Sequence, residues 1–93
     1  MMTAKQVFYK GHVQGVGFRY STKRIASGFD VTGWVKNLPD GRVHLMAQAF
    51  EADELDAFLE DIQQSSLGSH IKEREMKVVP AETGLRGFSI VRD

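Results

Sequence analysis

The chain has 93 residues, which favours a single domain over residues 1–93 and leaves no room for a second hydrophobic core. Twelve basic and twelve acidic residues give a formal net charge of +0, without the basic excess that nucleic-acid binders usually carry. The absence of cysteine excludes disulfides, thiolate metal sites and a thiol nucleophile, and it suits a reducing cytoplasm. The first ten residues, MMTAKQVFYK, include no apolar segment long enough for a signal peptide or a membrane span.

The first predicted elements are a strand and a helix separated by glycines. Alternation in QVFYKGHV (6–13) indicates a strand that is apolar on both sides near its middle. The glycine-rich stretch GHVQGVG (11–17) overlaps its end. From Phe18 onward, apolar residues recur at steps of three and four, which predicts a helix that ends near Gly28.

Two strands joined by a tight turn come next. DVTGWVKN (30–37) and RVHLMAQAF (42–50) both alternate, and the LPDG between them has proline early and glycine late, as turns prefer. A hairpin is therefore expected here.

The remainder of the chain predicts a second helix and two more strands. The helix runs from about Ala52 to Gln63, because apolar residues occupy the i, i+3, i+4 and i+7 positions of one stripe (Leu55, Phe58, Leu59 and Ile62). SSLGSH (65–70) is expected to be a loop. IKEREMKVV (71–79) is a highly charged strand suited to a sheet edge, and FSIV (88–91) is a short last strand.

This order predicts an α+β fold of the ferredoxin-like, split βαβ type (βαββαβ). Two helices would cover one face of an antiparallel sheet of four to five strands. Many unrelated activities use this fold, so function has to be inferred from particular residues.

The glycine stretch has the features of an anion-binding loop. Gly15 and Gly17 would let consecutive backbone N–H groups turn inward, and the loop leads into a helix N-terminus. Arg19 adds a planar fork of donors that matches two phosphate oxygens. Glycine count alone favours a tight strand-to-helix connection with a surface arginine, because short glycine loops are common. The spacing matches neither the dinucleotide fingerprint nor the nucleotide-triphosphate loop.

Asn37, at the end of the second strand, is the other polar candidate. Its amide offers one acceptor and two donors, so it could orient a water molecule without taking a proton. From spacing alone, support of the LPDG turn is the better explanation of this asparagine.

Taken together, GHVQGVGFR and GWVKNLPDGRV closely resemble the two signatures of the acylphosphatase family. The closing GFSIVR, the element order and the length are also similar, so the resemblance covers essentially the whole chain. The matching positions are Gly11, Val13, Gln14, Gly15, Val16, Phe18 and Arg19, then Gly33, Trp34, Val35, Lys36, Asn37, Gly41 and Val43. Ala49 departs from the glycine usual in the pattern, and we expect a local backbone adjustment there with activity retained.

The resemblance implies hydrolysis of the carboxyl-phosphate bond of small acyl phosphates to a carboxylate and inorganic phosphate. It implies that Arg19 and Asn37 are catalytic, with Arg19 and the loop holding the phosphoryl oxygens and Asn37 positioning the attacking water. The loop residues concerned are Gln14, Gly15, Val16, Gly17 and Phe18. No metal or cofactor is expected, since the three histidines lack metal-ligand spacing. We expect a cytoplasmic monomer that binds a small acyl phosphate, and neither nucleic acid nor a membrane.

Three alternatives remain open at this point. RNA-recognition domains share the element order, but RVHLMAQAF lacks their basic-glycine-aromatic pattern. A regulatory module could bind acyl phosphate or phosphate without turning it over. The chain also resembles the acylphosphatase-like module of a larger carbamoyl-phosphate-using maturation protein, although it looks self-contained.

Overall fold

The computed structural model describes residues 2–92. Its elements follow the predicted order, with one addition, a 3-10 helix (η1) in place of the expected 65–70 loop. They are β1 (Thr3–Gly11), α1 (Phe18–Ala26), β2 (Thr32–Asn37), β3 (Val43–Ala49), α2 (Ala52–Gln64), η1 (Ser66–His70), β4 (Ile71–Val79) and β5 (Phe88–Val91).

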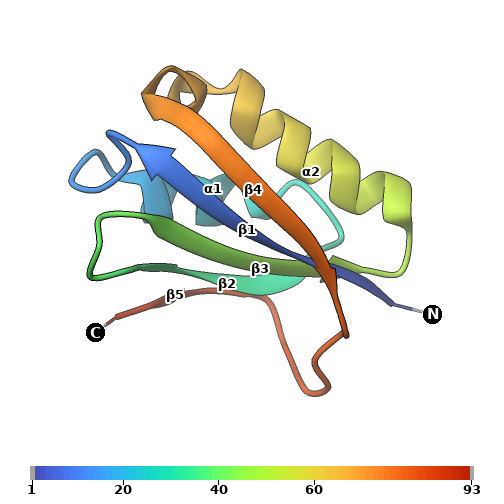
Figure 1. The fold of residues 1–93 in the computed structure, drawn as a ribbon. Helices are drawn as coiled ribbons and strands as arrows, with labels where there is room; N and C mark the ends of the chain where they lie inside the picture. The colour runs from blue at the N-terminus through green and yellow to red at the C-terminus, as the bar shows by residue number, and fades with distance from the viewer. Residues whose placement is uncertain (1, 93) are drawn as a thin grey trace.

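The strands form one five-stranded sheet in the order β4-β1-β3-β2-β5. The pairs β1–β3, β1–β4 and β2–β3 are antiparallel, as expected for the ferredoxin-like fold. β5 runs parallel to β2, so the whole sheet is mixed. Both helices cover one face of it (Figure 1).

The parallel pairing of β5 follows from the path of residues 80–87. This segment carries the chain from the β4 edge of the sheet to the opposite edge, on the side away from the helices (Figure 1). Gln48 fastens it: the Gln48 amide nitrogen donates to the Glu82 carbonyl at 2.9 Å, and the Glu82 N–H donates to Gln48 Oε1 at 2.8 Å. The crossing therefore brings the C-terminal strand alongside β2.

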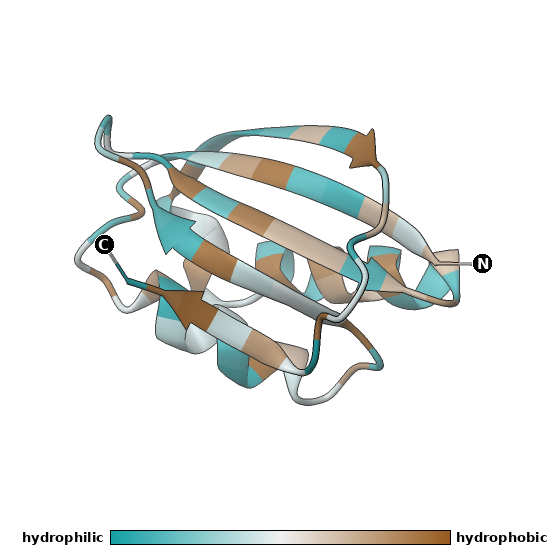
Figure 2. Ribbon diagram, turned by 90° about the horizontal axis from the view of Figure 1, so that it is seen from below, coloured by the Kyte–Doolittle hydropathy of each residue, from teal (hydrophilic) through white to brown (hydrophobic). Residues whose placement is uncertain are grey.

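Alternation along the strands places the hydrophobic core between the sheet and the helices. Val7 and Tyr9 of β1 are fully buried, and so are alternate residues of β3 and the predicted stripe of α2. Figure 2 shows hydrophilic and hydrophobic residues alternating along the strands. Burying one large aliphatic or aromatic side chain contributes about 1.5–3 kcal/mol, so this layer is the main source of stability.

β1 begins and ends earlier than its sequence pattern predicts. Thr3 already pairs with Ala49, so the strand starts three residues before the expected Gln6. It stops at Gly11, where φ is 132° and the register with β4 shifts. A Cβ at Gly11 would lie 2.5 Å from the His70 carbonyl oxygen, so only glycine fits this close approach.

Candidate active site

The connection between β1 and α1 depends on two glycines in the left-handed region. Gly15 has a φ of 79° and Gly17 a φ of 76°, and a Cβ at either position would meet no atom within 4 Å. Glycine is needed there because of the backbone conformation, and not because of crowding. Gly17 is also the N-cap of α1, so the loop ends directly at the start of that helix.

The start of α1 presents backbone donors. The first helical hydrogen bond joins the Ser21 N–H to the Gly17 carbonyl at 2.9 Å. The N–H groups of Phe18, Arg19 and Tyr20 precede it and have no acceptor within the helix. The first turn has no acidic side chain, so the positive end of the helix dipole is not neutralised locally.

The side chain of Gln14 connects the loop to the β2–β3 hairpin. Its amide nitrogen donates to the Leu38 carbonyl at 2.8 Å and to the Arg42 carbonyl at 2.9 Å. These two bonds fix the loop relative to the strand end that carries Asn37. The amide group of Gln14 is thereby engaged with the hairpin.

The hairpin itself is held by its turn. Leu38 N–H donates to the Arg42 carbonyl at 2.8 Å, and Arg42 donates to both carboxylate oxygens of Asp40. Hydrogen bonding from the Arg42 N–H lowers the pKa of Asp40, an exposed residue. Asn37, the last residue of β2, lies opposite Val43 and just before this turn.

The loop, the helix start, the end of β2 and the C-terminal strand together surround a cavity of about 200 Å³, here called the loop cavity. Its lining residues are Gly15, Gly17, Phe18, Arg19, Tyr20, Asn37, Ile90 and Arg92. Five of the residues expected from sequence therefore meet here. Gln14 and Val16 do not line it: Gln14 contacts the hairpin and Val16 packs against the core.

Sequence reasoning missed Tyr20, Ile90 and Arg92. Ile90 and Arg92 reach the cavity because β5 runs parallel to β2, with Val35 opposite Ile90 and Lys36 opposite Val91. The closing GFSIVR does resemble the family pattern. Its position beside the cavity depends on the pairing of β5 with β2, which the alternation of apolar and polar residues does not reveal. Arg19 Nη1 lies 3.4 Å from the Val91 carbonyl oxygen, a long contact between the helix start and β5.

The loop cavity is electropositive. Two guanidinium groups, from Arg19 and Arg92, line it, and no aspartate or glutamate among residues 2–92 does. On the neighbouring sheet face, burial and the positive charges of Lys36 and Arg42 lower the pKa of His44. Donor N–H groups, a helix N-terminus and two arginines suit a small anion of phosphate size.

Within residues 2–92, no three histidine, aspartate or glutamate side chains gather in a way that could hold a metal ion. Over the same part of the chain, no helix is long and apolar enough to cross a membrane.

Comparison with known proteins identifies the family. The acylphosphatase family model matches residues 5–90. The chain belongs to the acylphosphatase family. The acylphosphatase of Archaeoglobus fulgidus is 41% identical over 81 residues, which covers 87% of this chain and 90% of that protein. The acylphosphatase of Lactobacillus johnsonii is 42% identical over 82 residues, covering 87% and 89%.

Solved structures agree with this membership. The crystal structure of acylphosphatase from Bacillus subtilis superimposes with a TM-score of 0.85 at 34% identity, covering 99% of this chain and all of that one. Full-length HypF in a phosphate- and nucleotide-bound form matches with a TM-score of 0.84 at 25% identity, but only over 12% of its length. The ferredoxin-like acylphosphatase fold and acylphosphatase activity follow from these relationships.

Proposed function

We propose that the loop cavity is the site of acyl phosphate hydrolysis. The phosphoryl oxygens bind Arg19 and the backbone N–H groups between Gln14 and Arg19, including those of Gly15, Val16, Gly17 and Phe18. The Asn37 side chain holds the water that attacks phosphorus.

One observation carries the proposal: the glycine loop, Arg19 and Asn37 line the same cavity although they come from separate elements. The loop supplies left-handed glycines and unpaired helical donors, which suit a tetrahedral dianion. The Gln14 bridge to the hairpin supports a fixed distance between the bound phosphoryl group and Asn37.

The chemistry needs few functional groups. Water forms a bond to phosphorus while the bond between phosphorus and the acyl oxygen breaks, and the bonding pair leaves on the carboxylate. A carboxylate is a weak base, so its departure needs no general acid. The proton of the water passes to a phosphoryl oxygen, and the products are the carboxylate and inorganic phosphate. Positioning and charge stabilisation account for catalysis of this kind.

We also propose that the reaction uses no metal or cofactor and that the protein acts as a single-domain monomer in the cytoplasm. Selectivity for the acyl group is expected to be loose, because the residues assigned to the reaction all address the phosphoryl group or the water. Acetyl, carbamoyl and glyceroyl phosphates are all suitable substrates on this basis.

The test is hydrolysis of benzoyl phosphate in the presence of a chelator by the parent protein, Arg19→Ala, Arg19→Lys and Asn37→Ala. Loss of one preorganised donor typically lowers kcat by about 10²–10³. We expect a loss of this size in Asn37→Ala and a larger one in Arg19→Ala, which also loses a full charge. Arg19→Lys keeps the charge but not the two-pronged donor geometry, so its kcat should lie between those of the parent and Arg19→Ala.

Arg24→Ala is the matched control, since Arg24 is an exposed arginine of the same helix that does not line the cavity. Circular dichroism of each variant separates lost chemistry from lost fold. Turnover that persists in folded Arg19→Ala or Asn37→Ala would contradict the assigned roles. A folded parent that binds phosphate without turnover would leave a regulatory binding module.

A further inference from the structure

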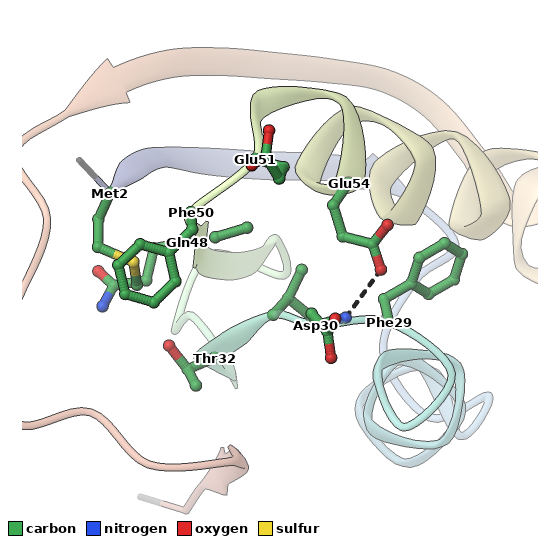
Figure 3. Close-up of a pocket in the computed structure, with 10 residues that line it drawn as sticks. Met2, Phe29, Asp30, Thr32, Gln48, Phe50, Glu51 and Glu54 are labelled. Carbon is green, nitrogen blue, oxygen red and sulfur yellow. Dashed lines mark hydrogen bonds between the residues drawn. The ribbon is translucent and has the colours of Figure 1, made fainter.

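A second cavity lies at the opposite end of the sheet from the glycine loop. It has a volume of about 520 Å³ and opens where β3 leads into α2 (Figure 3). Its lining includes Met2, which precedes β1, and Ala49, the last residue of β3. Ala49 pairs with Thr3 at the end of β1 that is farthest from the loop. Volumes of 300–1,000 Å³ are usual for small-molecule sites, so this cavity has room for an organic ligand.

Much of its lining is apolar. Met2, Phe29, Val31, Ala49 and Phe50 contribute side chains to it. Phe50 as a residue is 74% exposed, so much of its surface is in contact with water at the rim. The ring turns toward Met2 in Figure 3. Apolar groups of a ligand could remove part of this surface from water.

The charged groups of this lining all have one sign. Asp30, Glu51 and Glu54 contribute carboxylates, and no lysine, arginine or histidine among residues 2–92 lines the cavity. Because of these residues, we call it the acidic cavity. The Asp30 N–H donates to Glu54 Oε2 at 2.9 Å and fixes this carboxylate, as the dashed line in Figure 3 shows. The nearby N-terminus of α2 offsets only part of the three negative charges.

The hydroxyl of Thr32 lies behind the surface of this cavity. Thr32 Oγ1 is buried and has no hydrogen-bond partner among residues 2–92, although Thr32 lines the cavity. This oxygen is closed to solvent, so a ligand in the cavity does not reach it, and binding depends on the carboxylates and the apolar groups. The acidic residues do not form a metal site, since no suitable group of three occurs in the described part of the chain.

We propose that the acidic cavity binds small organic cations that carry an apolar body, of the arylalkylammonium class. The apolar body packs on Phe50 and Val31, and the ammonium group lies among the carboxylates and over the Phe50 or Phe29 ring. A cation over an aromatic face gains attraction in addition to that of the carboxylates. Anions, including acyl phosphates, are repelled here, so this site is separate from the loop cavity in both place and ligand charge.

The test is a titration of the ¹⁵N-labelled protein with 2-phenylethylammonium, followed by ¹H–¹⁵N correlation spectra. 3-Phenylpropionate, of similar size and opposite charge, is the matched control ligand. We expect saturable shifts for the cation at residues 29–32 and 48–54, with the amides of the glycine loop unmoved. The anion should give no saturable shift in those two segments.

Three variants test which groups hold the cation. Glu51→Gln removes one charge without changing shape, and it should weaken binding about two- to fivefold, the range for exposed charge pairs. Phe50→Ala should also weaken it. Asp61→Asn, which removes one charge from the far end of the same helix, should not. Absence of saturable shifts, an equal response to the anion, or equal weakening by Asp61→Asn would each overturn the proposal.

Discussion

Arg92 is a single residue whose placement in the loop cavity adds a second guanidinium beside Arg19. Arg92→Gln should raise the KM for benzoyl phosphate about two- to fivefold, because an exposed cation contributes modestly to binding a dianion. The fall in kcat should be smaller. Arg86→Gln, at an exposed arginine in the 80–87 segment, is the control. Steady-state kinetics decide, and an unchanged KM in Arg92→Gln would exclude this contribution.

Ala49 is the residue at which the chain departs from the glycine usual in the second signature. Among residues 2–92, positive φ angles occur only at glycines, so Ala49 does not have a left-handed backbone. It is 2% exposed and pairs with Thr3. Ala49→Gly should therefore lower the free energy of unfolding by about 0.5–1 kcal/mol, through lost packing and a more flexible unfolded chain. Urea denaturation measures this, and a more stable variant would contradict it.

At the scale of elements, the close approach of β2 to β3 depends on Gly33. A Cβ at this position would lie 1.9 Å from the Met46 carbonyl oxygen, a backbone atom that moves only if its strand moves. Gly33→Ala should separate the two strands and cost about 1–3 kcal/mol. For a domain of this size that corresponds to a drop in Tm on the order of 10 °C.

Gly28→Ala is the comparison for this prediction. The added Cβ would lie 3.5 Å from its nearest neighbour, the Ile25 carbonyl oxygen, and Gly28 has no positive φ. The substitution should be neutral or stabilise the fold by up to about 1 kcal/mol, since it restricts the unfolded chain. Differential scanning calorimetry of both variants tests the contrast. Equal Tm values for the two would show that the β2–β3 contact tolerates a methyl group.

Most elements could be predicted from sequence because their signals are local. Periodicity places the buried stripe of α2, and the bounds predicted for β4 and β5 agree with the structure. The direction of β5 could not be predicted in this way, because it depends on the route of residues 80–87 and its Gln48–Glu82 hydrogen bonds. The same limit explains the candidate site: Arg19 and Asn37 have sequence signals, whereas Arg92 enters through β5.

At the scale of the whole molecule, a formal net charge of +0 conceals an uneven distribution of charge. The loop cavity at one end of the sheet is lined by two arginines and no carboxylate among residues 2–92. The acidic cavity at the other end is lined by three carboxylates and, among residues 2–92, by no arginine, lysine or histidine. Opposite local potentials can therefore recruit ligands of opposite charge to the two ends, although composition alone indicates no preference.

Stability of the whole fold should also depend on alkaline pH through Tyr9. Burial raises the pKa of Tyr9 above its ordinary value of about 10, and the positive charge of Arg74 opposes this only in part. Above pH 10 the unfolded chain releases the phenolic proton while the folded protein retains it. The folded state then binds more protons, so the free energy of unfolding falls as pH rises, by up to about 1.4 kcal/mol per pH unit. Below pH 10 this contribution is fully present.

Tyr9→Phe isolates the effect. The Tyr9 hydroxyl is buried without a hydrogen-bond partner among residues 2–92. The ring centroids of Tyr9 and Phe18 lie 5.0 Å apart. Phenylalanine at position 9 should therefore keep the same ring packing at pH 7. Tyr20→Phe, at a tyrosine that is 68% exposed, is the control. Urea unfolding between pH 8 and 12 should give a shallower decline for Tyr9→Phe than for the parent or Tyr20→Phe. Parallel curves for all three proteins would show that alkaline destabilisation arises elsewhere, for example from lysines losing their charge.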